Sequence, residues 1–116
     1  MNYFDIINRL SGDGLDVALP GYRNGVCSSP YVVVQKSGTY RYAQSPALGY
    51  TLFTVHCYVP LYSYEQLDTL IQRVKSALKA LEPDLRPVGN EGIFTINDSF
   101  KAHEGYLEYM LQKRLF

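Results

Sequence analysis

Residues 50–81, YTLFTVHCYVPLYSYEQLDTLIQRVKSALKAL, decide the fold because the apolar residues change their spacing within them. In residues 50–59, every second position from Phe53 to Val59 is apolar, as on one face of a β-strand. From Leu67 to Leu81, apolar residues recur at intervals of three and four, which is the spacing of a helix with one buried face. The stretch therefore predicts a strand, ended by Pro60, and then an amphipathic helix.

The helix has start and stop signals. Ser63 is a residue type that caps helix starts, and Gln66 three positions later completes a capping box. Glu82 precedes Pro83, and the residue before a proline avoids helical backbone geometry. These signals predict a helix over about 63–81.

The other elements are shorter. Residues 2–10 have apolar side chains at helical spacing and precede a glycine-rich stop at 11–14. Residues 31–35, YVVVQ, predict a central strand covered on both faces, turned by Ser37-Gly38. Residues 86–92 are rich in turn formers, and residues 93–96, IFTI, predict a short strand.

Length and composition favour a single globular domain, 1–116. The chain has 47% hydrophobic and 19% charged residues, with eleven basic and eleven acidic side chains. No concentrated run of Lys and Arg indicates nucleic-acid binding, and no stretch approaches the ~20 apolar residues of a membrane span. Asp5 within the first residues argues against a secretion signal. Two cysteines, Cys27 and Cys57, favour free thiols in a reducing, cytoplasmic setting, although one disulfide remains open.

The neighbours His56 and Cys57 are the obvious place to look for chemistry. Adjacent strand residues point to opposite faces of a sheet, so these two side chains are predicted not to form a dyad. We expect Cys57 to pack in the core and His56 to be a hydrogen-bonded residue of the sheet surface. Glu104 and Glu108 are four apart and fit a solvated face.

No motif indicates an enzyme. The two His and two Cys lack the close spacing of a metal site, and the nucleophile elbow G-x-S-x-G is absent from the sequence. We therefore predict no catalytic residues, no metal and no cofactor. The eleven tyrosines and the lack of tryptophan instead favour surfaces that bind other proteins, since tyrosine has an apolar body and a polar tip.

The pattern as a whole resembles the small tail-terminator (tail-completion) proteins of long-tailed bacteriophages, particularly those of Gram-positive hosts. The resemblance rests on PYVVVQKSGTY (30–40), YTLFTVHCYVP (50–60), a helix that starts near Tyr64 and KAHEGYLEY (101–109). It implies an α+β domain with a mostly antiparallel sheet of about four strands, on which the N-terminal helix and the main helix pack. Residues 101–116 fit both a strand and a helix by periodicity, and the resemblance implies a strand carrying Leu107, Tyr109 and Leu111. Glu104-Gly105 departs from the larger or basic residues expected there.

The resemblance also implies a function and partners. Such proteins form a ring, commonly of six copies, on the head-proximal end of the tail tube. The ring stops tube polymerisation and docks to the head connector. The expected partners are therefore further copies of the chain, the tail tube protein and the head-tail connector protein, and the expected location is the virion after assembly in the host cytoplasm. The first alternative is another neck or head-closure component. The less favoured alternative is a small metal- or thiol-dependent enzyme built on His56 or Cys57.

Two segments are the candidates for these contacts. The arm from Lys36 to Tyr50, interrupted by Ser45-Pro46, is expected to project as a hairpin. The loop between Pro20 and Pro30 is the second candidate. The predicted interface residues are aromatic and basic: Tyr40, Arg41, Tyr42 and Tyr50 from the arm, and Tyr22 and Arg23 from the loop.

Overall fold

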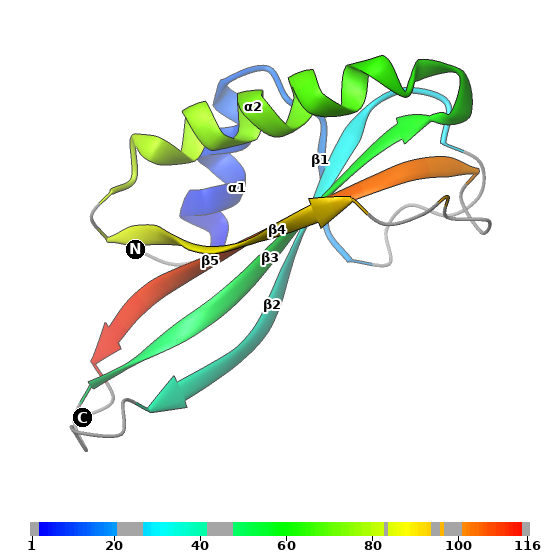
Figure 1. Ribbon diagram of the computed structural model, residues 1–116. Helices are drawn as coiled ribbons and strands as arrows, with labels where there is room; N and C mark the ends of the chain where they lie inside the picture. The colour runs from blue at the N-terminus through cyan, green and yellow to red at the C-terminus, as the bar shows by residue number, and fades with distance from the viewer. Residues whose placement is uncertain are drawn as a thin grey trace.

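A computed structural model describes residues 3–20, 27–41, 48–82, 84–93, 96 and 101–114. Two α-helices pack on one sheet in this part of the chain (Figure 1). The elements in chain order are α1 (Tyr3–Gly12), β1 (Val17–Ala18), β2 (Tyr31–Arg41), β3 (Leu48–Pro60), a 3-10 turn (Leu61–Ser63), α2 (Glu65–Lys79), β4 (Leu85–Ile93) and β5 (Ala102–Arg114).

The sheet has the strand order β1-β2-β3-β5-β4 among the described residues. Strands β2, β3, β5 and β4 pair antiparallel, and the two-residue strand β1 pairs parallel with β2. The predicted α+β class with a mostly antiparallel sheet is confirmed. The fifth strand, β1, was not predicted, because two residues are too few to give a periodicity.

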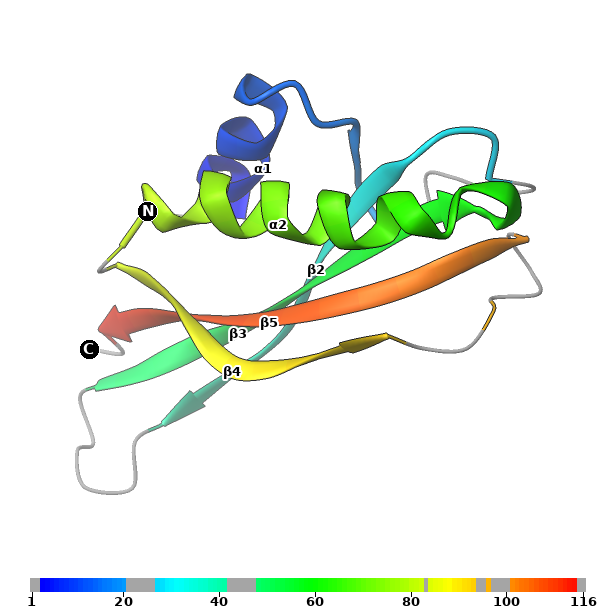
Figure 2. The same cartoon turned by 45° about the horizontal axis from the view of Figure 1, so that its top comes forward.

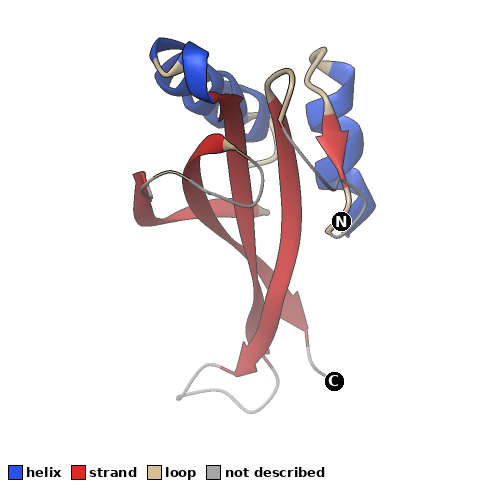
Figure 3. Ribbon diagram, turned by 90° about the vertical axis from the view of Figure 1, so that its right-hand side faces the viewer, coloured by secondary structure: helices blue, strands red, loops and turns tan. Residues whose placement is uncertain are grey.

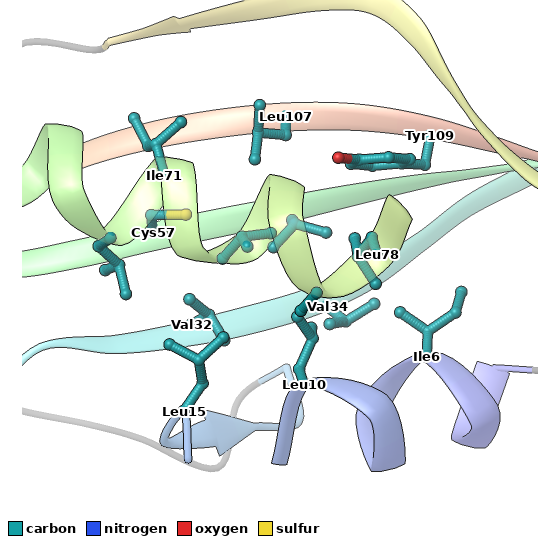
Figure 4. Close-up of a cluster of buried hydrophobic side chains, with 14 of the residues drawn as sticks. Ile6, Leu10, Leu15, Val32, Val34, Cys57, Ile71, Leu78, Leu107 and Tyr109 are labelled. Atoms are coloured by element: carbon teal, nitrogen blue, oxygen red, sulfur yellow. The ribbon is translucent and has the colours of Figure 1, made fainter. Parts of the chain in front are cut away.

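Both helices pack against the same face of the sheet and lie above it in Figure 1, and Figure 3 gives the view along α2. Ile6 and Leu10 of α1 share one core cluster with Val32 and Val34 of β2, and α2 packs against β3 and β5. Figure 4 shows Ile6, Leu10 and Leu78 between the helices and the strands. The arginine Arg9 joins the two helices, since its Nε donates to the carbonyl oxygen of Ala77 at 3.0 Å.

Strand β3 is the central element, and it alternates as its sequence predicts. Phe53, Val55, Cys57 and Val59 are all buried in the core on the helix side. It pairs with β2 from Tyr58↔Tyr31 to Gly49↔Arg41 and with β5 along its whole length. The predicted end at Pro60 is confirmed.

The start of α2 differs from the prediction. The helix spans Glu65–Lys79, and Ser63 lies in the preceding 3-10 turn, so the capping box of Ser63 and Gln66 is wrong. The N-cap position is Tyr64, with φ −52° and ψ −40° and without a side-chain cap hydrogen bond. A capping side chain requires a non-helical backbone at its own residue. Here the 3-10 turn after Pro60 already has nearly helical geometry, so the chain enters α2 without a capping residue.

Strand β2 also runs further than predicted. Ser37-Gly38 is not a turn, because β2 continues to Arg41 with a shift of register between Lys36 and Gly38. A bulge absorbs the extra residue without ending the strand. The sequence predicted that β2 is buried on both faces, and this holds only for its first residues. Val32 and Val34 lie in the main core, and Tyr31 belongs to a smaller buried cluster on the other face. Gln35 is exposed.

Residues 86–92 form most of β4 and are not a turn-rich loop, which corrects the prediction. The register shifts between Pro87 and Glu91, and Gly89 between them has φ +96°. Proline and glycine are tolerated there because β4 is an edge strand, where a missing N–H and a bulge break no interior ladder. Of the predicted strand 93–96, Ile93 ends β4, Ile96 is not in a strand, and residues 94 and 95 lie outside the described residues.

The segment left ambiguous by periodicity is the strand β5. Leu107, Tyr109 and Leu111 face the core, as the resemblance implies. At Gly105 the helix α2 approaches β5 closely, since a Cβ there would lie 2.9 Å from the Cδ1 methyl of Ile71. The close approach of Ile71 thus explains why glycine stands at position 105, where the resemblance leads one to expect a larger or basic residue.

Candidate interaction surface

The ends of β2, β3 and β5 extend past both helices and form a three-stranded ribbon (Figures 1 and 2). We define this ribbon as Thr39–Arg41, Leu48–Tyr50 and Gln112–Arg114. Tyr40 pairs with Tyr50, which pairs with Gln112 on the other side. The long axis of the molecule, 48 Å against 26 and 24 Å, reflects this extension.

The outer edge of the ribbon is open within the described part of the chain. Strand β1 pairs only with Val32 and Val33, so no described strand pairs with the edge of β2 that faces away from β3, from Gln35 to Arg41. The carbonyl oxygen of Val34, at the boundary, accepts a hydrogen bond from the hydroxyl of Tyr3. Open strand edges can pair with another chain. Lys36 and the bulge that follows it are features that protect such edges from indiscriminate pairing.

Three of the six predicted interface residues lie together on this ribbon. The rings of Tyr40 and Tyr50 are 5.5 Å apart, and Tyr40 is 46% exposed. Arg41 lies opposite Gly49 in the register. Tyr22, Arg23 and Tyr42 lie outside the described residues. The pairing of β2 with β3 therefore brings Tyr40, Arg41 and Tyr50 of the predicted arm together.

Sequence reasoning missed an exposed apolar residue on the same ribbon and a second surface at the other end of β3. Leu48 begins β3 and is exposed. At the other end, Leu61, Tyr62 and Tyr64 are exposed, and Tyr62 is 79% exposed. These three residues lie between the strand period of β3 and the helix period of α2. The spacing of the three, at 61, 62 and 64, fits neither period and was the available signal.

His56 makes two polar contacts on the sheet surface, as predicted. Its Nδ1 lies 3.1 Å from Oε2 of Glu104, and its Nε2 lies 3.0 Å from Oε1 of Gln35. Glu104 is only 8% exposed, so its assignment to a solvated face is wrong. A carboxylate is tolerated in such a place when it has a charged or hydrogen-bonding partner. Burial, and then the nearby Glu104, raises the pKa of the Tyr58 phenol above its ordinary value.

Cys57 is fully buried on the opposite face, in the core (Figure 4). Burial, followed by the negative charge of Glu104, raises the pKa of its thiol to about 12. The thiol is therefore protonated at neutral pH and is a poor nucleophile. Cys27 is also buried, its thiol donates to the carbonyl oxygen of Ser29 at 3.3 Å, and the two cysteines form no disulfide with each other. No dyad of His56 and Cys57 exists.

Two shallow grooves run along α2 beside β4, with volumes of about 390 and 330 Å³. Both contain Lys75 and Glu91, which form an ion pair of 2.7 Å. The larger also contains Tyr109, whose pKa is raised to about 12 by burial and then by Glu91. In both grooves the charges of Lys75 and Glu91 thus partly neutralise each other.

The described residues contain no group of three or more His, Cys, Asp or Glu side chains placed to hold a metal ion. Within the same residues, no helix has the length and apolar character to cross a membrane. His103, the second histidine, lies 3.1 Å through its Nε2 from the carbonyl oxygen of Leu61 and contacts the ring of Tyr64 edge-on.

No protein-family model matches this sequence, and no curated protein matches it significantly.

Proposed function

We propose that this protein is a structural component of a bacteriophage tail that caps the head-proximal end of the tail tube. In this role a ring of copies, six in the expected case, stops tube polymerisation and docks to the head connector. The ring assembles in the host cytoplasm and remains in the neck of the virion. The partners are other copies of the chain, the tail tube protein and the head-tail connector protein.

The observation that carries the proposal is the ribbon. Three strands leave the cover of the helices, no described strand pairs with the outer backbone edge over Gln35–Arg41, and Tyr40 is exposed beside Tyr50. Aromatic side chains are enriched in protein interfaces, and open edges accept strands from partners. Such a ribbon favours binding to a neighbouring protein over binding a small molecule.

The chemistry of the conspicuous side chains agrees with a structural role. Cys57 is buried and protonated, and both ring nitrogens of His56 contact polar side chains of the sheet. Among the described residues, the features that remain for function are therefore surfaces. Head-to-tail contacts between identical copies give a closed ring when the rotation between them closes.

The decisive experiment is deletion of the gene from the genome that encodes it, followed by electron microscopy of the particles. Overlong tails without heads are the expected result, because nothing then stops polymerisation of the tube. Tails of normal length that fail to join heads would instead indicate another neck component. Normal virions would overturn the proposal.

A measurement on the purified chain complements the deletion. Light scattering at several concentrations, with negative-stain microscopy, is expected to show a ring, alone or on added tail tubes. The variant Tyr40→Asp places a charge on the exposed side of the ribbon and should weaken the assembly. The matched control is Ser76→Asp, which places the same charge on the exposed side of α2 and should leave the assembly unchanged.

A further inference from the structure

The chain is neutral overall, but its charges are unevenly distributed. Residues 17–64 contain no Asp or Glu at all. The ribbon and the described residues that adjoin it, 36–41, 48–53 and 109–114, contain four basic residues and no acidic one: Lys36, Arg41, Lys113 and Arg114. Lys36 is exposed and forms no ion pair with another described residue. This end of the molecule is therefore basic, and Tyr40 and Leu48 add an apolar surface.

The opposite end of β3 has the complementary character. Directly after the 3-10 turn, Glu65 and Asp68 lie in the first turn of α2, and both are exposed. No ion pair joins either carboxylate to a described residue. Further along α2, the cations Arg73 and Lys75 are engaged elsewhere, with the carbonyl oxygen of Asp13 and with Glu91.

Exposed aromatic rings adjoin these acidic residues. Tyr64 is 53% exposed and packs edge-on against His103, with 4.7 Å between the ring centroids. The hydroxyl of Tyr62 donates to the carbonyl oxygen of Ser28 at 3.3 Å, which holds its ring against the surface. Rings whose positions are already held lose little conformational entropy when a partner covers them.

The two ends cannot meet within one molecule. They lie at opposite ends of β3, which spans Leu48–Pro60, and a strand of that length extends roughly 40 Å. A second copy can bring them together, with the basic end of one molecule against the acidic end of the next. Because the two surfaces differ, this contact is head-to-tail, which is the type that builds rings.

We infer that the ribbon, with Lys36 and Arg41, docks on the start of α2 of a second copy, at Glu65, Asp68 and the tyrosines beside them. This inference rests on the proposed function, since it names the contact between neighbours in the ring. Opposite charges orient the two copies, and basic side chains can lie against the tyrosine rings. The same charges disfavour pairing of two ribbons or of two helix starts.

The acidic residues also have a local role, which the test must separate from assembly. Carboxylates in the first turn of a helix are stabilised by the helix dipole. Replacing them weakens α2 in any case. The readout is therefore assembly, measured by light scattering or sedimentation at 50 mM and 300 mM salt, with thermal unfolding measured in parallel to confirm that each variant is folded.

Three charge variants form the experiment. Lys36→Glu/Arg41→Glu and Glu65→Lys/Asp68→Lys each place like charges across the contact, and each should weaken association by roughly tenfold or more. The chain that combines all four substitutions restores opposite charges and the original net charge, and it should assemble again. Lys79→Glu and Glu82→Lys, which reverse exposed charges at the other end of α2, are the controls and should leave assembly unchanged.

Mixing the two reversed chains gives a second measurement. Neither assembles alone, but together they should form oligomers in which the two kinds of copy alternate. If the wild-type chain forms rings and the reversed variants do so equally well, or if neither the four-fold variant nor the mixture recovers, this interface is wrong while the proposed function stands. A wild-type chain that stays monomeric alone and on tail tubes overturns the ring and this interface together.

Discussion

The buried thiol of Cys57 shows how position determines the chemistry of a single residue. Next to a histidine in the sequence, it resembles half of a catalytic pair, yet the strand places it in an apolar layer under α2. The core raises its pKa to about 12, so the folded protein keeps the thiol proton well above neutral pH. The consequence is measurable as a dependence of stability on pH.

We predict that the free energy of unfolding falls as the pH rises above about 9. The unfolded chain loses the Cys57 proton near that pH, whereas the folded chain keeps it up to about 12, so deprotonation favours the unfolded state. This thiol contributes a slope of at most about 1.4 kcal/mol per pH unit. Urea unfolding at pH 8, 9 and 10 measures the slope, and Cys57→Ala should reduce it. An unchanged slope in that variant would show that the thiol titrates normally.

His56 and Glu104 form a polar side-chain contact between β3 and β5 on the face away from the helices. Glu104 is nearly buried and lies 3.1 Å from Nδ1 of His56. Removing one member of such a pair leaves the other in a poorly hydrated place, which costs more than the loss of the hydrogen bond alone.

We therefore predict that His56 and Glu104 are energetically coupled. His56→Ala should destabilise the fold by about 1–3 kcal/mol, and most of this loss should disappear when Glu104 is already Gln. A double-mutant cycle of chemical unfolding measures the coupling. His103→Ala is the control, since His103 contacts a backbone carbonyl and no buried carboxylate. Additive effects of His56→Ala and Glu104→Gln would argue against the coupling.

At the scale of elements, the contact between α2 and β5 depends on a residue without a side chain. Gly105 lies on the face of β5 beneath Leu67 and Ile71. A Cβ at this position would lie 2.9 Å from Ile71 Cδ1 and 3.5 Å from Leu67 Cδ1. The helix can therefore approach the sheet closely only because the strand has glycine there.

We predict that Gly105→Ala destabilises the protein by about 1 kcal/mol or more, because the added methyl overpacks this contact. Ile71→Val removes the very methyl group in conflict, so the cost of Gly105→Ala should shrink in that background. The same substitution at Gly12, where a Cβ would meet nothing within 4 Å, should be close to neutral. Urea unfolding measures the effect of Gly105→Ala in the wild-type and Ile71→Val chains. Equal effects in the two chains would show that the added methyl does not clash with Ile71 Cδ1.

At the scale of the whole molecule, the protein has a covered part and an extended part. The helices bury one face of the sheet around Val34 and Val55, whereas the ribbon around Tyr40 and Tyr50 lies beyond them. Local opening is easiest where few apolar contacts hold the backbone. The ribbon is thus expected to be the least stable part of the described sheet.

We predict that, in the isolated chain, backbone amides exchange faster in the ribbon than in the helix-covered part of the sheet. Amides of residues 39–41 and 49–50 should exchange at least roughly tenfold faster than those of residues 55–59, because opening the ribbon exposes little apolar surface. Mass spectrometry of peptides, or NMR, measures the difference. Assembly should slow exchange in the ribbon if this is the contact surface. Uniform protection along β3 would contradict the division.

The sequence by itself determined the elements whose side chains follow one clear period. The alternation from Phe53 to Val59 gave β3 its buried face and separated His56 from Cys57, and the spacing from Leu67 to Leu81 placed the buried face of α2. Both results follow from local backbone geometry, which needs no knowledge of the rest of the chain. The Tyr40–Tyr50 surface was predicted for the same reason, as the two arms of one hairpin.

Only the tertiary structure decided the features that depend on neighbours distant in sequence. The pairing of β4 with β5 makes a strand of a segment rich in proline and glycine, and a bulge carries β2 through Ser37-Gly38. The burial of Glu104 depends on its place beside His56 in the sheet, and the close packing at Gly105 depends on α2 above it. Likewise, the two charged ends are distinguishable only once β3 separates them. In each case the determining contact joins residues far apart along the chain, and a local pattern carries no record of such contacts.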